Sequence, residues 1–166
     1  MSSAGTDLYD DRNSLLELLA RYVSIPDTKD WDDLPPKVFT DPLTWDFQSI
    51  GGPSPTPQPL GEIVARLRIG FTGFEATHHS ATSPRITIDG DKAHIRAHIR
   101  AEHWVPSNLV PSDSSNCWLL VGFYDDEAVR TSDGWRIQSV KLTVTHQENA
   151  HLYSLAIAEG RRIHGL

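Results

Sequence analysis

The sequence predicts an α+β domain in which helices from the front half of the chain cover one face of a curved antiparallel β-sheet. Apolar residues recur at helical spacing within the first seventy residues, whereas the rear half alternates apolar and polar residues over long runs. Asp-Gly pairs at 89–90 and 133–134 interrupt these runs, as is typical of β-hairpins. The length of 166 residues fits one domain spanning 1–166, with flexible ends expected at 1–7 and 160–166.

The first predicted helix covers residues 8–23, where leucines and other apolar residues share one face. We expect it to end before Pro26, because the residue that precedes a proline avoids the helical region. The next segment, 27–33, holds four aspartates. It is either a solvated loop that caps a short helix ending at Val38, or a turn that points one carboxylate inward. Residues 60–69 and 152–163 also show helical spacing.

The expected strands cover residues 44–48, 75–82, 85–88, 93–104, 117–130 and 135–146. Residues 51–59 contain four prolines and two glycines, which predicts a stiff extended loop. The segment 105–116 is a second long connection, and loops of this length in compact domains are usually functional lids or disordered.

The most informative strand is 93–104, because its alternation has one exception. One face carries small apolar residues from Ala93 to Ala101 and then His103, while the other face is polar. His103 is therefore expected to point inward, toward a space that the alanines leave open. A buried polar group without a hydrogen bond costs roughly 1–3 kcal/mol, so His103 needs a partner from elsewhere in the chain.

Composition excludes several classes of protein. The formal net charge of −7 argues against nucleic acid or an anionic membrane surface as a partner, since both require a basic surface. No run of about 20 apolar residues is present, and the N-terminus has no signal-peptide pattern. A single cysteine allows no internal disulfide. We expect a cytoplasmic protein.

Eight histidines invite a metal site, but their spacing argues against one. His94 and His98 share a strand face, yet four residues along a strand separate their Cα atoms by about 13 Å. His78 and His79 are adjacent and point to opposite faces, and neither CxxC nor HExxH occurs. We therefore expect no metal. The histidines expected on the surface are His94, His98, His146, His151 and His164, which leaves His79 and His103 as functional candidates.

The order of several short motifs identifies a family resemblance. They are Arg21-Tyr22, the acidic segment 27–32, Thr77-His78-His79, Asp89-Gly90-Asp91-Lys92-Ala93, Ala101-Glu102-His103, Tyr124-Asp125 and the segment 130–135. With these motifs the chain resembles, over roughly residues 8–147, the SnoaL-like branch of the nuclear transport factor 2-like superfamily. Within that branch it is most similar to the scytalone dehydratase and bile acid dehydratase type.

The resemblance implies a cone-shaped barrel, in which a curved mixed or antiparallel sheet encloses a deep pocket closed by the N-terminal helices. It also implies a pocket in which two histidines and an aspartate catalyse loss of water without a cofactor. By motif position these residues are Asp27, His79 and His103. The sequence departs from scytalone dehydratase at Pro26, where that enzyme has a tyrosine that helps polarise the substrate carbonyl.

The working hypothesis is a cofactor-independent lyase or isomerase, plausible in secondary metabolism, that acts on a hydrophobic carbonyl compound. Asp27 would orient His103, and His79 would be the second acid–base group. Further residues are assigned to substrate binding: Tyr22 and Tyr124 at the carbonyl oxygen, and Trp31, Trp45 and Phe47 as apolar walls. The 105–116 segment would exclude water.

Two alternatives use the same pocket: a polyketide or terpenoid cyclase, and a binding module that holds a small ligand without catalysis. A homodimer or homotrimer is also expected, because the outer face of strand 93–104 mixes charged and aromatic side chains. These are Arg96, Arg100, Glu102 and Trp104.

Overall fold

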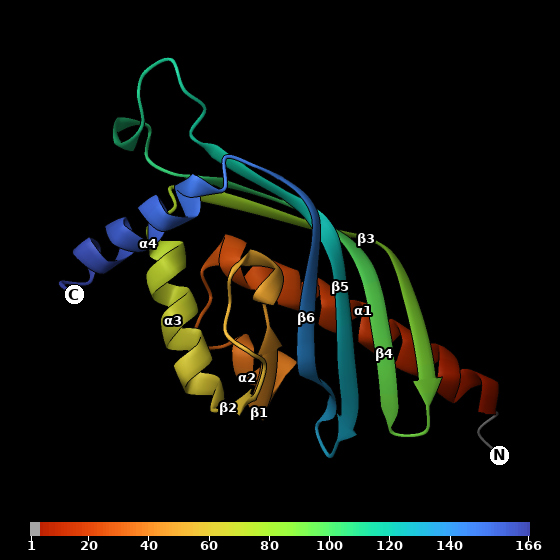
Figure 1. Ribbon diagram of the computed structural model, residues 1–166. Helices are drawn as coiled ribbons and strands as arrows, with labels where there is room; N and C mark the ends of the chain where they lie inside the picture. The colour runs from red at the N-terminus through yellow and green to blue at the C-terminus, as the bar shows by residue number, and fades with distance from the viewer. Residues whose placement is uncertain (1–3) are drawn as a thin grey trace.

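The computed structural model describes residues 4–166, with side chains described from Leu8 onward. It has the predicted α+β architecture (Figure 1). The helices are α1 (Ala4–Thr28), α2 (Pro35–Val38), α3 (Leu60–Thr72) and α4 (His151–Ile163). Residues 1–3 of the predicted flexible N-terminal segment lie outside the described residues, and α4 continues into the predicted flexible C-terminal segment.

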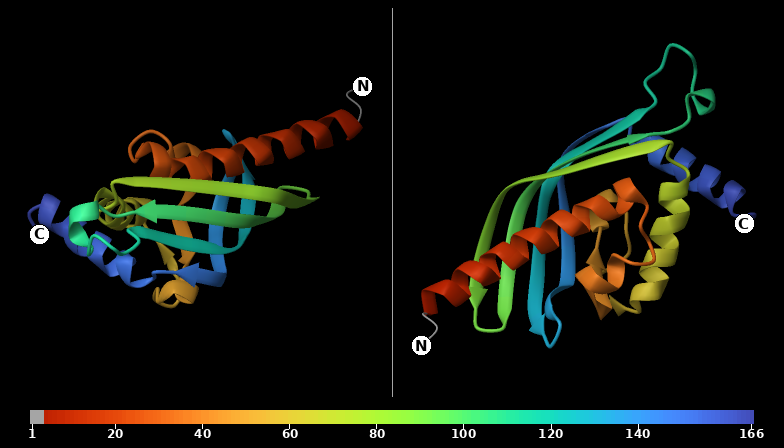
Figure 2. Two further views of the ribbon diagram at one scale, coloured as in Figure 1. Left: turned by 90° about the horizontal axis from the view of Figure 1, so that it is seen from above. Right: turned by 180° about the vertical axis from the view of Figure 1, so that it is seen from behind.

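One mixed six-stranded sheet forms the other half of the domain. Its strands lie in the order β2-β1-β6-β5-β4-β3. Only the β1–β6 pairing among them is parallel. The sheet curves without closing, and α1 crosses its concave side (Figures 1 and 2). The strand bounds are β1 (Phe39–Asp46), β2 (Pro57–Gln58), β3 (Ala76–Asp89), β4 (Lys92–Trp104), β5 (Cys117–Thr131) and β6 (Gly134–Glu148).

Strand β4 confirms the alternation argument. Its predicted inner face, from Ala93 to His103, is at most 6% exposed, and His103 itself is 3% exposed. The hairpin turns fall where the Asp-Gly pairs predict them, with Gly90 and Gly134 at positive φ. The two strands expected at 75–82 and 85–88 are one strand, β3, whose register shifts between Thr82 and Arg85.

Helix α1 is longer than predicted: it does not end before Pro26 but continues to Thr28. The last turn is held from outside the helix, since Asp27 accepts hydrogen bonds from β3. Thr28 also donates from Oγ1 to the carbonyl oxygen of Ser24, and Lys29 ends the helix with φ of 57°. These interactions override the local preference set by proline, and they decide where Asp27 points.

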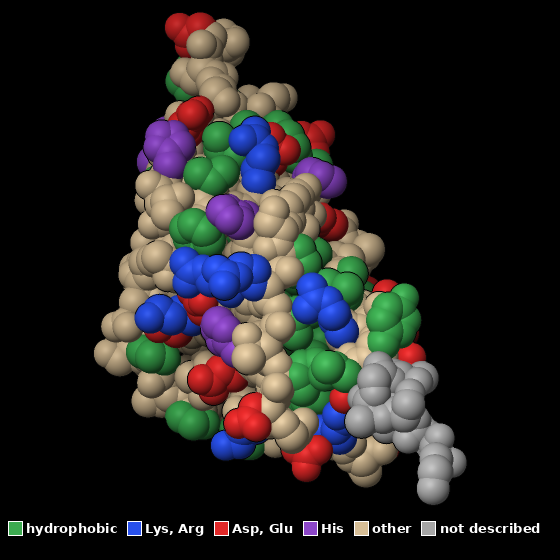
Figure 3. All heavy atoms as spheres, turned by 90° about the vertical axis from the view of Figure 1, so that its right-hand side faces the viewer, with side chains coloured by type: hydrophobic (Ala, Val, Ile, Leu, Met, Phe, Trp, Pro, Cys, Tyr) green, Lys and Arg blue, Asp and Glu red, His purple; other side chains and the backbone are tan. Residues whose placement is uncertain are grey.

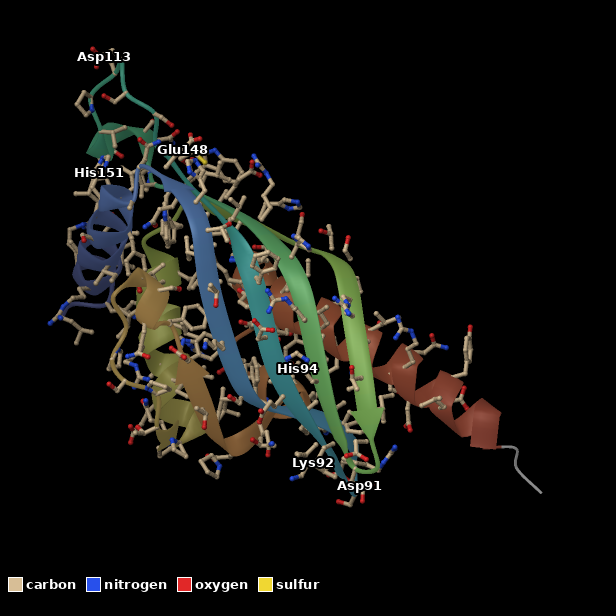
Figure 4. All side chains as sticks on the ribbon, turned by 45° about the vertical axis from the view of Figure 1, so that its right-hand side comes forward. Asp91, Lys92, His94, Asp113, Glu148 and His151 are labelled. Atoms are coloured by element: carbon tan, nitrogen blue, oxygen red, sulfur yellow. The ribbon has the colours of Figure 1, made fainter. Side chains whose placement is uncertain are left out.

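The 105–116 segment extends beyond the end of the sheet (Figure 1). Asp113 lies at its tip, above His151 at the start of α4 (Figure 4). Its base is closed by Val105 and Asn116, which exchange a backbone hydrogen bond and a side-chain hydrogen bond. Within residues 4–166, none of the helices combines the length and the apolar character that crossing a membrane requires.

Candidate active site

A cavity of about 650 Å³ lies between the concave face of the sheet and the helices. This volume is in the range of small-molecule sites. Its walls are mainly aromatic and aliphatic, and the residues predicted to bind substrate all line it: Tyr22, Trp31, Trp45, Phe47 and Tyr124. Trp45 and Phe47 stack with their ring centroids 4.4 Å apart. Both candidate histidines, His79 and His103, also line the cavity.

His79, on the wall of this cavity, is tightly bonded to Asp27, which is not itself a wall residue. Oδ1 of Asp27 lies 2.7 Å from Nδ1 of His79, and its Oδ2 accepts the backbone N–H of His79 at 2.8 Å. Thr77, two residues earlier on the same face of β3, donates from Oγ1 to Oδ1 at 2.8 Å. The aspartate thus fixes both the ring and the backbone of the histidine.

The same hydrogen bonds keep Asp27 ionised. Burial acts to raise the pKa of Asp27, but the hydrogen bonds from His79 and Thr77 outweigh it and lower that pKa below its ordinary value. A carboxylate that accepts from Nδ1 fixes the tautomer in which Nδ1 carries the proton. Nε2 of His79 is then the nitrogen with a free lone pair, which suits a general base.

His103 is not the partner of Asp27, so that part of the sequence hypothesis is wrong. Its Nδ1 lies 3.3 Å from the carbonyl oxygen of Trp118, and its ring stacks on the Trp118 indole at 4.4 Å. The edge of the His79 ring meets it at a centroid distance of 4.9 Å. The reason is register: Thr77 of β3 pairs with His103, which places His79 beside Ala101 and closer to the end of α1.

Burial, reinforced by the nearby charge of His79, lowers the pKa of His103 to about 3. His103 is therefore neutral near pH 7. The carbonyl of Trp118 requires a proton on Nδ1, which leaves Nε2 as an acceptor. The site thus combines one imidazole beside a carboxylate with a second, uncharged imidazole at its edge.

The neutral state of His103 predicts a specific acid sensitivity. Below pH 6.5 the unfolded chain takes up a proton at this position, whereas the folded chain does so only near pH 3. As the pH falls from 6.5 toward 3, protonation of His103 in the unfolded chain therefore lowers the free energy of unfolding by roughly 1.4 kcal/mol per pH unit. In His103→Gln this loss should vanish, as measured by urea unfolding at pH 7 and pH 5. His98→Gln, on the outer face of β4, is the control; an equal change in both variants would contradict the prediction.

A further buried polar group, Asp126, lies near Tyr22 and Tyr124. Rings of Tyr22 and Tyr124 are 4.9 Å apart, and burial raises the pKa of both, so both remain protonated donors. Asp126, two residues beyond Tyr124 on the inner face of β5, is 0% exposed. Among the described residues, the buried side-chain atoms without a hydrogen-bond partner are the Tyr22 hydroxyl and the two Asp126 oxygens.

Burial raises the pKa of Asp126 well above its ordinary value, so this carboxyl is protonated in the folded chain. The unfolded chain releases that proton above about pH 4, so stability falls as pH rises from there toward the raised pKa. Asp126→Asn should remove this loss, and its melting temperature relative to the parent should increase from pH 5 to pH 8. Asp125→Asn, on the outer face beside Arg96, is the control. A difference independent of pH would contradict the account.

Sequence reasoning missed some of the site and misplaced one part. Thr77, Trp118 and Asp126 were not assigned to the site, although Thr77 belongs to the motif Thr77-His78-His79 and shares a strand face with His79. The 105–116 segment, which the sequence suggested could exclude water, contributes no residue to the cavity wall. The C-terminal helix does contribute, through Tyr153, Ile157 and Arg161.

The family described as a SnoaL-like domain matches residues 8–141. The uncharacterized protein Rv2910c from Mycobacterium tuberculosis is 30% identical over 129 residues, which cover 76% of this chain and 80% of the relative. The crystal structure of Kfla4162 from Kribbella flavida is 52% identical, with a TM-score of 0.86 over 89% of this chain and 99% of that one. A candidate scytalone dehydratase from Novosphingobium aromaticivorans shares the fold, at 17% identity and a TM-score of 0.71 over 89% and 91% of the two chains.

Proposed function

Because the chain belongs to the SnoaL-like domain family, we propose that it is a cofactor-independent lyase that removes water from a hydrophobic β-hydroxy carbonyl compound. The observation that carries the proposal is the Asp27–His79 pair, which is bonded at 2.7 Å and whose histidine lines a largely apolar cavity. A histidine whose tautomer is fixed by an ionised carboxylate is a general base that needs no metal or organic cofactor.

In the proposed reaction, Nε2 of His79 removes the proton from the carbon next to the carbonyl. The electron pair of that C–H bond moves toward the carbonyl oxygen, where Tyr22 and Tyr124 donate hydrogen bonds to the developing enolate. Collapse of the enolate forms the C=C bond and breaks the C–O bond to the β-hydroxyl. The imidazolium of His79 gives its proton to that oxygen, so that water leaves and the base is restored.

Asp27 contributes by stabilising the positive charge that His79 carries between the two proton transfers. His103, uncharged and in contact with the His79 ring, is proposed to accept a hydrogen bond from the leaving hydroxyl and hold it near His79. This division replaces the sequence hypothesis, in which Asp27 acted through His103.

A turnover screen tests the proposal. A panel of aryl and alkyl β-hydroxy ketones is incubated with the protein, and the conjugated enone product is followed by its ultraviolet absorbance. Turnover by the parent that is lost in His79→Gln supports a dehydratase. Tight binding of the same compounds without turnover would instead favour the alternative, a small-ligand-binding module in this cavity.

A homodimer or homotrimer is the expected assembly. The outer face of the sheet carries interspersed cations, anions and histidines (Figure 3), and Arg96 lies 4.5 Å over the Phe123 ring centroid. Arginine and aromatic residues are enriched at interfaces. Sedimentation at micromolar concentration should give two or three times 18.5 kDa, and Phe123→Glu should lower that mass. A parent chain that sediments as a monomer would contradict this expectation.

A further inference from the structure

Charged side chains line the cavity away from the group formed by His79, His103, Tyr22 and Tyr124. They are two exposed arginines, Arg66 on α3 and Arg161 on α4. Among the described residues, no aspartate or glutamate lines the wall, and Asp27 contacts it only through its bonds to His79. In a chain with a net charge of −7, this cavity therefore carries two arginines and no opposing carboxylate side chain.

Neither arginine is neutralised by a neighbour. In the described part of the chain, no carboxylate forms an ion pair with Arg66 or Arg161. Arg66 donates to the amide oxygen of Gln58 at 2.6 Å, which holds one end of its guanidinium and leaves its charge uncompensated. The arginines next to them differ: Arg68 pairs with Asp32, and Arg162 pairs with Glu159.

Close packing joins the two helices that carry these arginines. Gly160 of α4 lies so close to α3 that a Cβ atom there would collide with the carbonyl oxygen of Ile69. Gly73 makes the reciprocal close approach to the carbonyl oxygen of Ala156. Arg161 follows Gly160 directly, and Arg66 lies about one helical turn before Ile69. The glycine contacts thus fix the two helices that present these guanidinium groups to the cavity.

We propose that Arg66 and Arg161 form an anion subsite, and that the ligand of this cavity is an amphiphile with an oxyanion at one end and an apolar body. This inference rests on the proposed function, because it describes the end of the substrate that does not react at His79. Guanidinium groups bind carboxylates and phosphates through paired hydrogen bonds. The oxyanion of the ligand is a carboxylate or a phosphate group.

Calorimetric titration with three probes tests the subsite without turnover: 4-phenylbutanoate, 4-phenylbutyl phosphate and the uncharged methyl 4-phenylbutanoate. The parent should bind at least one anion about 10-fold or more tightly than the ester. Arg66→Gln and Arg161→Gln should each weaken binding of that anion by about 10-fold and leave binding of the ester unchanged. The tighter of the two anions identifies the carboxylate or the phosphate as the preferred group.

Arg68→Gln and Arg162→Gln are matched controls, because each removes a neighbouring charge that is already paired and is not part of this cavity wall. The proposal is overturned if the controls weaken anion binding as much as the test variants, or if the parent binds neither anion more tightly than the ester. His79→Gln should retain anion binding, so loss of turnover there and loss of binding in the arginine variants report separately on the proposed function and on the subsite.

Discussion

Replacing His79 with glutamine is expected to lower kcat for water elimination by about 10²–10⁴-fold, the usual contribution of a general base. Glutamine keeps a polar side chain of similar length but has no group that accepts a proton near neutral pH. The measurement is the initial rate of enone formation at saturating substrate. The value of KM should change little, because the apolar walls that bind the substrate are untouched.

His78→Gln is the matched control for this experiment. His78 is adjacent in β3, but it points to the opposite face, where it lies near Ser80 and is exposed. Its replacement should leave kcat within about 2-fold of the parent, the level expected of a change remote from the chemistry. A similar loss in both variants would indicate that β3 itself is perturbed, and would contradict a specific role for His79.

The second large effect is expected in Asp27→Asn, with a fall in kcat of about 10²-fold or more. An asparagine amide can turn its NH₂ group toward Nδ1 of His79, which favours the wrong tautomer and removes the charge that stabilises the imidazolium. Asp33→Asn, in an exposed position of the same acidic segment, should have no such effect.

The two losses should not add. If Asp27 acts only through His79, the double variant Asp27→Asn with His79→Gln should be about as slow as His79→Gln alone. Circular dichroism of each variant checks that the fold is retained. Losses that multiply would show that Asp27 and His79 act independently, and would contradict a role of Asp27 through its hydrogen bonds to His79.

Sequence periodicity predicted most of the strands, because the buried and exposed faces of a strand repeat every two residues. It placed His103 inside β4 and located both hairpins from their Asp-Gly turns, and the structure confirms these predictions. It also made β3 and β4 plausible neighbours, and they pair with Thr77 opposite His103. The family resemblance added the cone-shaped arrangement of the sheet around a deep pocket.

The partner of Asp27 could not be predicted in the same way. Its direction depends on the extra turn of α1 beyond Pro26, and that turn is stabilised by bonds to β3, about fifty residues away in the sequence. Local rules for proline predict that this turn is absent. Asp126 was missed for a related reason: acidic residues are rarely buried, so a carboxylate on an inward position of β5 is not expected from the sequence.

Exchange of the proton next to the carbonyl tests the central claim most directly. The parent and His79→Gln are incubated in D₂O with a ketone that lacks the β-hydroxyl group, and deuterium at the α-carbon is followed by NMR. The account predicts incorporation catalysed by the parent and nearly abolished in His79→Gln. Incorporation at the same rate in both proteins, or in neither, would contradict the assignment of His79 as the base.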